Sequence, residues 1–256
     1  MLMDLNGSGG LLKVNIDTEY YTYSILALKW AMTSSGKWVA TDRGAASDIY
    51  KADIIIYGTE STINSLVQYI YNNRRSSNNI IQFSNFSDTE KIFGPDVDHS
   101  LVNGTVISIT NRRQLSFHVW SIGLTIQAIN PTFTGSGAAS LSFVNADYAY
   151  SAYSRTTINK FDSYIGTFSF ADHTADTGIM DITVYLTEAQ AITFKRTVAT
   201  ERGSAITTTL MSGVDFPFGP LRDSAWPKNM KYLEVRDLEL WGVNRYKFAL
   251  KLVEDI

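Results

Sequence analysis

Three side chains that could bind a cation follow closely after the turn Phe93-Gly94-Pro95, namely Asp96, Asp98 and His99. Hard metal ions take clustered carboxylates as ligands, so a cation site is one interpretation of this segment. The second half of the chain offers only Arg222-Asp223 after a corresponding Gly-Pro turn. We therefore predict a solvated turn here, and no metal site.

The three histidines, His99, His118 and His173, share no metal-ligand spacing, and the chain has no cysteine. A thiolate site and a disulfide framework are thereby excluded. His118 alternates with Phe117 and Val119 in a segment that we predict as a strand. A surface or packed histidine is the interpretation that we favour.

Catalytic carboxylates could still assemble in space, as they do in glycoside hydrolases. Candidates such as Glu188 and Glu234 have simpler explanations, as a helix N-terminal charge and a strand-surface residue. The sequence contains no phosphate loop, nucleophile elbow, zinc-protease helix or dinucleotide fingerprint. We predict that the protein is not an enzyme and has no catalytic residue, cofactor or metal.

Two basic clusters, within Asn72-Asn73-Arg74-Arg75 and at Arg112-Arg113, lie in predicted loops. Nucleic-acid binding favours a net positive charge, whereas this chain carries −3. We interpret both clusters as solvated turns or subunit contacts.

Tyrosines gather in Tyr20-Tyr21-Thr22-Tyr23 and at Tyr148, Tyr150 and Tyr153. They could form a sugar-stacking platform, although tyrosine is also enriched at protein interfaces, which we prefer.

An amphipathic helix is predicted after Thr59, which occupies the N-cap position ahead of Glu60. Ile63, Leu66, Val67 and Ile70 recur with helical spacing and would form one apolar face. Such spacing is the primary signal for a helix that packs on a core.

A second helix is predicted at the corresponding place in the second half of the chain. Thr187 and Gln190 form a capping-box pattern, and Ala191, Phe194 and Val198 occupy the equivalent apolar face. The motif that opens the first helix, Tyr-Gly-Thr-Glu at 57–60, thus returns as Tyr-Leu-Thr-Glu at 185–188. Phe93-Gly94-Pro95 likewise returns at 218–220. The second half of the chain therefore restates the first.

Strands are predicted around each helix from runs of β-branched and aromatic residues. In the first half they are Leu11–Tyr23, Ile25–Thr41, Asp53–Tyr57, Ile80–Phe83, Thr105–Thr110 and Leu115–Ile129, with a turn at 111–114. In the second half they are Ala139–Ala152, Phe161–Ala171, Met180–Tyr185, Ala205–Leu210, Tyr232–Trp241 and Tyr246–Val253.

These elements predict a mainly β fold with flanking helices, in the α+β class. A doubly wound sheet needs strands that alternate with helices, so we predict two tandem antiparallel β-sandwich or open-barrel domains, each with one amphipathic helix. The Pro/Gly/Ser-rich stretch at 130–137 predicts a boundary between domains 1–132 and 133–256, with residues 1–10 as a flexible arm.

The composition points to a structural or interface-rich protein. Charged residues make up 18% of the chain, against roughly 25% in an average domain. The 12% of aromatic residues favours strands and interfaces. No apolar run reaches the length of a membrane span, and the N-terminal residues lack the layout of a signal peptide. We expect a protein that is made in the cytoplasm and does not bind membranes.

In element order, in duplication and in its lack of cysteine, this chain resembles the tail-tube fold of bacteriophages and contractile injection machines. The resemblance implies a tail-tube, baseplate-hub, distal-tail or tube-initiator component in the virion. Three two-domain chains would form a pseudo-sixfold ring, in contact with neighbouring tube and baseplate proteins. Tape-measure protein and DNA would pass through its lumen without sequence-specific binding.

The resemblance also implies roles for particular segments. The hairpins at 105–129 and 232–253 would line a mildly acidic lumen, and loops at 72–79, 84–104 and 211–230 would contact adjacent rings.

Two rival hypotheses remain from the residues themselves. One is a tandem β-sandwich that binds carbohydrate or a cell surface through residues such as Tyr148 and Trp226. The other is a hydrolase with carboxylates in a cleft between the halves.

Overall fold

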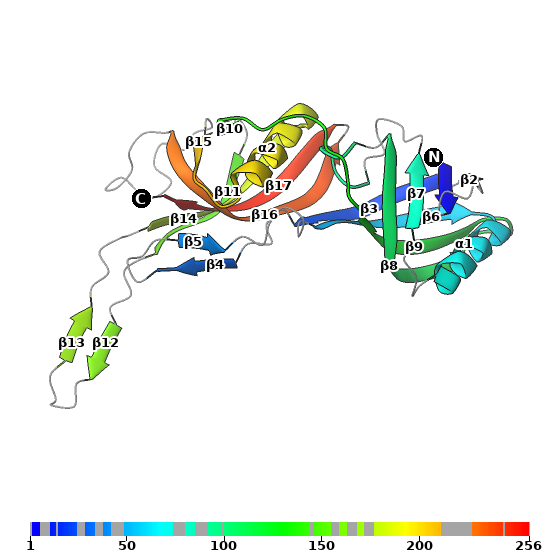
Figure 1. Cartoon of the computed structure of the whole chain (residues 1–256), viewed down its shortest axis with the longest axis horizontal. Coiled ribbons are helices and arrows are strands. Elements are labelled where there is room, and N and C mark those ends of the chain that lie inside the picture. Colours follow the sequence, from blue (N-terminus) through cyan, green and yellow to red (C-terminus); the bar gives the residue numbers. More distant parts are fainter. Residues whose placement is uncertain are drawn as a thin grey trace. The chain divides into compact units, whose positions relative to one another are not determined.

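The computed structural model describes residues 2–5, 11–13, 15–24, 29–33, 38–41, 49–73, 80–84, 92–98, 100–143, 146–154, 159–162, 168–171, 177–210, 227–242 and 244–255. Strands account for 57% of the structure, and two helices accompany several sheets (Figure 1). The predicted mainly β, α+β class is confirmed.

The chain forms two compact units. Residues 1–24, 49–135 and 237–245 make up the first unit, and residues 25–48, 136–236 and 246–256 make up the second. The change from one unit to the next at 135–136 falls inside the predicted connector. Because residues 25–48 and 237–245 each group with the other half, the simple boundary at residue 132 stays a prediction.

The first unit contains a seven-stranded sheet in which all neighbouring strands are antiparallel. Its order is β2 (Leu11–Lys13), β1 (Leu2–Leu5), β7 (Ile80–Ser84), β8 (Leu101–Gln114), β9 (Trp120–Ala128), β6 (Ile49–Gly58) and β3 (Asn15–Ser24). Helix α1 (Glu60–Asn73) packs across β6 and β9.

The predicted start and face of α1 are confirmed. The Thr59 hydroxyl accepts the backbone N–H of Thr62 at 3.2 Å, which satisfies one of the free donors of the first turn. Ile63, Leu66 and Ile70 are buried against the sheet, whereas Val67 is half-buried. Alternate residues of β6 and β9 complete this core, including Ile54, Ile56, Ile122, Leu124 and Ile126.

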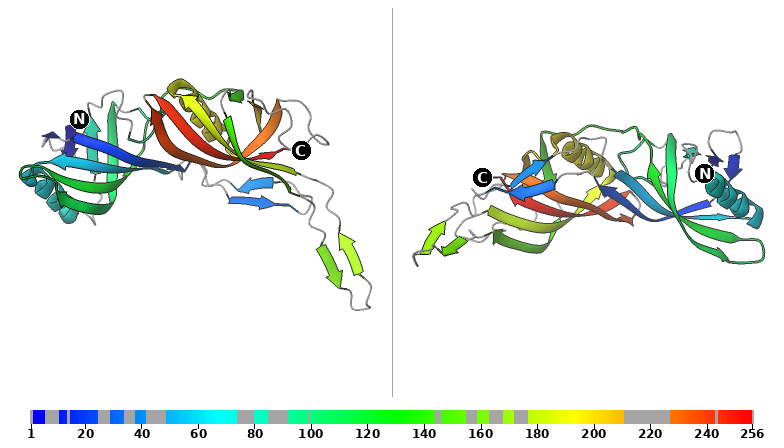
Figure 2. Two further views of the ribbon diagram at one scale, coloured as in Figure 1. Left: turned by 180° about the vertical axis from the view of Figure 1, so that it is seen from behind. Right: turned by 60° about the horizontal axis from the view of Figure 1, so that its bottom comes forward.

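The second unit contains a six-stranded sheet. Its order is β10 (Ser140–Phe143), β15 (Ile206–Leu210), β16 (Lys228–Gly242), β17 (Arg245–Glu254), β14 (Thr177–Thr187) and β11 (Ala146–Ser154). Helix α2 (Glu188–Glu201) contacts β14. Two hairpins lie outside the main sheets, β4 (Lys29–Met32) with β5 (Trp38–Thr41) and β12 (Asn159–Asp162) with β13 (Phe168–Ala171) (Figure 2).

Helix α2 begins with the predicted capping box. The Thr187 hydroxyl accepts the Gln190 N–H, and the Gln190 side chain accepts the Thr187 N–H at 2.9 Å. The predicted buried residues Ala191, Phe194 and Val198 all face the core. The Phe194 ring centroid lies 5.8 Å from that of Phe143, 5.8 Å from that of Tyr232 and 5.3 Å from that of Phe248. An aromatic cluster therefore fills the second core.

Four strand predictions were wrong. Leu11–Tyr23 divides into β2 and β3, which lie at opposite edges of one sheet. The segment Ile25–Thr41 is not one strand, because the short strands β4 and β5 within it pair with each other. Ala139–Ala152 divides into β10 and β11, which lie at opposite edges of one sheet. Phe161–Ala171 contains a hairpin between β12 and β13. Turn-forming residues interrupt two of these segments, at Ser34-Ser35-Gly36 and at Gly166, and such residues mark places where a chain can reverse.

The two main sheets repeat one strand order around their helices. Reading β7-β8-β9-β6-β3 in the first sheet matches β15-β16-β17-β14-β11 in the second. A β-bulge also recurs at one place, between Thr18 and Tyr20 opposite β6 and between Tyr148 and Tyr150 opposite β14. The sheets differ beyond β7 and β15: β1 is antiparallel to β7 and is followed by β2, whereas β10 is parallel to β15 and ends the sheet.

Candidate assembly surface

Most of the exposed large apolar side chains described in the first unit lie on the outer half of the β8–β9 hairpin. Near its base, Val102 and Val106 of β8 are buried in the core. From Ile107 to Val119 every residue is exposed. The strands thus extend beyond the core that they help to build, and we call residues 107–120 the hairpin end.

The turn of this hairpin is further along the chain than predicted. Asn111-Arg112-Arg113-Gln114 was predicted as the turn, but it belongs to β8. Asn111 has a positive φ of 46°, and the register with β9 shifts between Thr110 and Arg113. Asn tolerates this left-handed conformation, so the polar run forms a bulge and the strand continues.

The actual turn is closed by backbone hydrogen bonds between Leu115 and Val119. The Leu115 N–H donates to the Val119 carbonyl at 2.9 Å, and the Val119 N–H donates to the Ser116 carbonyl at 3.3 Å. His118 therefore lies in an exposed turn, and its prediction as a strand residue was wrong. Its ring meets that of Phe117 edge-on, with centroids 4.6 Å apart.

Arg112 joins the hairpin end to α1. Its guanidinium donates a hydrogen bond to the Asn64 side-chain carbonyl and lies 5.0 Å from the centre of the Trp120 ring. Cation–π stacking of this kind stabilises exposed pairs by roughly 0.5–1 kcal/mol. The guanidinium thereby links Trp120 of the hairpin end to Asn64 of α1. This link gives the hairpin end a defined orientation on the helix.

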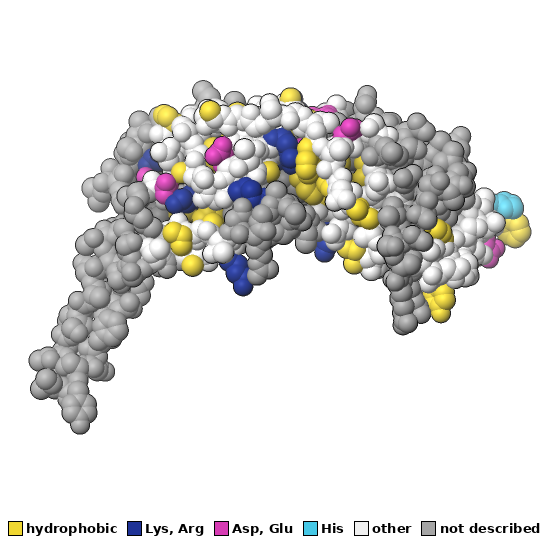
Figure 3. All heavy atoms as spheres, in the orientation of Figure 1, with side chains coloured by type: hydrophobic (Ala, Val, Ile, Leu, Met, Phe, Trp, Pro, Cys, Tyr) yellow, Lys and Arg dark blue, Asp and Glu magenta, His cyan; other side chains and the backbone are white. Residues whose placement is uncertain are grey.

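Five large apolar side chains are exposed on the hairpin end. They are Ile107, Ile109, Leu115, Phe117 and Val119, and Phe117 is 85% exposed. Hydrophobic side chains are visible beside the histidine at the right-hand edge of Figure 3. Single exposed apolar residues are ordinary on proteins, but five such side chains within residues 107–119 indicate an interaction surface.

The hairpin end carries positive charge. Residues 101–129 contain Arg112 and Arg113 and no acidic residue. The other predicted lumen segment, 232–253, contains three acidic and four basic residues. The two hairpins that the resemblance places around a lumen are therefore not acidic, and most of the acidic residues that give the chain its net charge lie elsewhere.

Asp96 is buried, so the prediction of a solvated turn was wrong at this residue. It has no exposed surface, and the Tyr50 hydroxyl approaches its carboxylate at 3.4 Å. The Asp96 carbonyl also accepts a hydrogen bond from the Thr134 N–H at 2.8 Å. The Asp98 N–H in turn donates to the Thr132 carbonyl. The segment thus holds the connector, and the described residues contain no cluster of three potential metal ligands. His99 lies outside the described residues.

The two glutamates proposed as catalytic candidates have structural partners. Glu188 begins α2, and the exposed Glu234 on β16 pairs with Arg236, whose Nε donates to it at 2.6 Å. Both positions agree with the simpler explanations from the sequence. Asn72 and Asn73 end α1, and Arg74, Arg75, His173 and Trp226 lie outside the described residues.

The tyrosine groups lie on strands at the edges of the two main sheets. Tyr20–Tyr23 belong to β3, and Tyr148, Tyr150 and Tyr153 belong to β11. Both strands end their sheets. The directions of these side chains lie outside what the structure describes, so neither sugar stacking nor an interface is tested.

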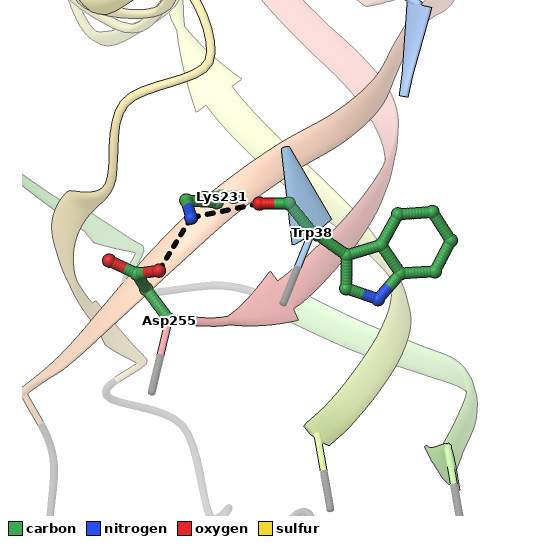
Figure 4. A network of polar contacts seen from close by, with 3 residues as sticks. All are labelled: Trp38, Lys231 and Asp255. Atoms are coloured by element: carbon green, nitrogen blue, oxygen red, sulfur yellow. Dashed lines mark hydrogen bonds and ion pairs between the residues drawn. The ribbon is translucent and has the colours of Figure 1, made fainter. Parts of the chain in front are cut away.

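In the second unit, one ammonium group links three segments. Lys231 Nζ on β16 lies 2.6 Å from the Asp255 carboxylate and donates to the Trp38 carbonyl at 3.1 Å (Figure 4). Its side chain is only 16% exposed. The lysine thereby attaches the β4–β5 hairpin and the segment after β17 to the main sheet.

Comparison with protein-family models gave no match, and comparison with curated proteins gave none either. None of the described helices is both long and apolar enough to cross a membrane.

Proposed function

We propose that this protein is a structural subunit of a phage or phage-like tail. In this proposal its two halves are tube-like modules, and three chains form a pseudo-sixfold ring that lines or terminates the tail tube at the baseplate. The observation that carries the proposal is the strand order shared by the two main sheets. A chain that presents one module twice can take two successive positions in a ring.

The β-bulge supports an origin of both modules in one ancestral unit. Tyr20 lies opposite Asp53 immediately after the first bulge, and Tyr150 lies opposite Asp181 after the second. The two aspartates are separated along the chain by the same interval as the first residues of the two helices. Bulges change the twist of a strand and persist within families, so the matching positions favour duplication over two independent sheets.

The helix faces support the same origin. Ile63, Leu66 and Ile70 of α1 are buried, and their counterparts at that same interval, Ala191, Phe194 and Val198, are also buried. Where α1 has Ile and Leu, α2 has the smaller Ala and the larger Phe. The same three positions are therefore buried in both helices, although their side chains differ in volume.

Self-assembly is supported by the hairpin end. Its five exposed apolar side chains would be covered by a neighbouring chain in a ring, which would remove them from water. Closing a ring of sheets also leaves no unpaired edge. Because this hairpin carries positive charge, the proposal includes no acidic lumen. It retains passage of tape-measure protein and DNA without sequence-specific binding, and tube and baseplate proteins as neighbours.

Electron microscopy of the purified full-length chain tests the proposal, together with light scattering over a range of concentrations. We expect trimers, seen as rings with six lobes of similar size. Addition of a neighbouring tube protein provides a second condition, because some tube subunits assemble only on a partner. A protein that stays monomeric in both conditions, or that forms rings without sixfold pseudo-symmetry, would contradict it.

A further inference from the structure

The hairpins β4–β5 and β12–β13 occupy equivalent places in the two halves of the chain. Each is inserted at the end of a matching strand pair, where Ser24 lies opposite Ile49 and Ser154 lies opposite Thr177. Every strand of both hairpins has four residues. The loops between the paired strands are also equal in length. The two hairpins are therefore counterparts in the repeat.

The first of these hairpins is inserted between two strands of the first unit but lies in the second unit. Residues 25–48 leave β3 and return to β6, yet they group with the second unit. Trp30, Trp38 and Ala40 are half-buried, and exposed residues alternate with them. Lys231 of β16 donates to the Trp38 carbonyl at 3.1 Å. A hairpin that belongs to one half of the repeat thus docks on the sheet of the other.

The place where β4–β5 docks has a counterpart in the first unit. In the second unit, the Asp255 N–H after β17 donates to the Asn229 carbonyl at 2.9 Å. In the first unit, the Ile129 N–H after β9 donates to the Asn103 carbonyl at 2.8 Å. Asn103 and Asn229 are separated by the same interval as Ile129 and Asp255. Ile129 therefore takes the place of Asp255.

This counterpart surface carries no charge. At the same interval, Thr105 takes the place of Lys231, so the ion pair between Lys231 and Asp255 becomes Thr105 and Ile129. Both are half-buried within one chain. An uncharged and partly exposed surface thus stands where the second unit holds a docked hairpin.

The β12–β13 hairpin matches such a surface in its composition. Phe168 and Phe170 of β13 stand at the positions that Trp38 and Ala40 occupy in β5. Aromatic residues are enriched in the buried parts of interfaces between proteins. An uncharged landing surface is therefore paired with a hairpin of greater aromatic content at the matching positions.

A second segment is exchanged in the opposite direction. Residues 237–245 connect β16 to β17 of the second sheet, yet they group with the first unit. Their counterparts, at the interval that separates Asn103 from Asn229, are residues 111–119. These lie in the hairpin end, where large apolar side chains are exposed. Each exchanged segment of the chain thus has one counterpart that the exchange within a single chain leaves unused.

From this exchange we propose that the β12–β13 hairpin docks on the first unit of a second copy of this chain, beside Thr105 and Ile129. In the same contact, the hairpin end of that second copy docks on the second unit of the first. Between chains, the two segments repeat what β4–β5 and residues 237–245 do within one chain. The contact joins unlike surfaces, so it continues from chain to chain and can close as a ring. The inference rests on the proposed function, because it assigns the segments that join successive modules.

Introduced cysteines test the inference in the full-length protein, which has no cysteine of its own. Ser169→Cys on β13 and Ile129→Cys are made as separate variants, mixed, and treated with a short bis-maleimide. We expect a covalent dimer from the mixture and none from either variant alone, with the link between the two cysteines identified by mass spectrometry. Absence of the mixed dimer, whether or not the chain assembles, would overturn the inference.

The matched control places cysteines at the corresponding positions of the exchange within one chain. Val39→Cys combined with Asp255→Cys should give a link inside a single chain, because Lys231 contacts both Asp255 and the carbonyl of Trp38. The double variant S169C/I129C should instead link different chains. A link inside single chains of that double variant, with no mixed dimer from the separate variants, would overturn the inference.

The same double variant distinguishes this inference from the proposed ring. Covalent products that stop at three chains would support both. Products that continue beyond three chains would support the docking and contradict the three-chain ring. Trimeric rings in the microscope without a mixed dimer would support the ring and overturn the docking.

Replacement of the hairpin gives a second measurement. Because Ser154 lies opposite Thr177, an Asn-Gly turn can replace residues 155–176. We expect self-association at least tenfold weaker and a melting temperature nearly unchanged. The same replacement of residues 25–48 removes contacts within one chain, so it should lower the melting temperature. A chain without residues 155–176 that assembles as well as the full chain would overturn the inference.

Discussion

The hydroxyl groups of Tyr232 and Thr208 lie 2.9 Å apart inside the second core. The Thr208 hydroxyl donates to the Ile206 carbonyl at 3.1 Å, so it accepts its second hydrogen bond from the Tyr232 phenol. Both residues are buried. Burial raises the pKa of Tyr232 well above its ordinary value of 10.0.

This buried phenol makes stability fall in alkaline solution. Above pH 10 the unfolded chain releases the Tyr232 proton while the folded chain keeps it, so the free energy of unfolding decreases by up to about 1.4 kcal/mol per pH unit. Tyr232→Phe should remove this contribution and cost about 1 kcal/mol at pH 7 for the lost hydrogen bond. Urea unfolding between pH 7 and pH 11 measures both; identical pH slopes for the two proteins would contradict the prediction.

Lys231 is expected to hold the β4–β5 hairpin in place. Lys231→Met keeps much of the side-chain volume but loses the contacts with Asp255 and with the Trp38 carbonyl, at a cost of about 1–2 kcal/mol because both are partly shielded from water. Amide hydrogen exchange at residues 38–41 should accelerate. Asp255→Asn removes one contact only and should give a smaller effect in the same direction. Unchanged exchange in K231M would contradict this role.

Gly137 allows the connector to lie directly on α2. A methyl group at this position would lie 2.9 Å from the backbone nitrogen and Cα of Thr197, and backbone atoms of a helix cannot move aside easily. Gly137→Ala should therefore cost about 1–3 kcal/mol. Thermal unfolding measures the change, with the exposed Ser136→Ala as the control. A G137A protein as stable as this control would show that the contact is not tight.

Arg112 is expected to set the direction of the hairpin end more than the stability of the fold. Asn64 is exposed and Trp120 is only half-buried, so Arg112→Lys should change the global free energy of unfolding by less than about 1 kcal/mol. The fluorescence of Trp120 should shift, and amide exchange across residues 108–119 should become severalfold faster. Arg113→Lys is the matched control. Equal effects of the two changes would argue against a specific stack.

The two helices could be predicted because their start signals lie close together in the sequence. Thr59 and the box formed by Thr187 and Gln190 act within one helical turn, so sequence spacing alone locates the helix starts. The strands that precede the helices, β6 and β14, could also be predicted from the sequence, because their buried residues alternate without interruption. By contrast, the prediction of a turn at 111–114 failed because an asparagine with positive φ can bulge a strand as easily as it can end one.

Features that depend on distant partners could not be predicted. Asp96 is buried through Tyr50 and the connector at Thr134, which are far away in the sequence. β10 lies at a sheet edge because it pairs with β15, which follows only after α2, and no further described strand covers it. No local pattern in Ser140–Phe143 distinguishes a covered strand from an open edge.

Assembly through the hairpin end gives the last prediction. Burial of a phenylalanine side chain stabilises a contact by roughly 1.5–3 kcal/mol, and 1.4 kcal/mol corresponds to a tenfold change in affinity. Because Phe117 is 85% exposed within one chain, Phe117→Ser should leave the melting temperature nearly unchanged. It should weaken self-association at least tenfold in sedimentation measurements. Tyr71 of α1 is 59% exposed, so Tyr71→Ser removes a comparable aromatic group from another surface. Equal loss of assembly in both variants would assign the effect to general surface hydrophobicity, and full assembly of F117S would exclude the hairpin end from the interface.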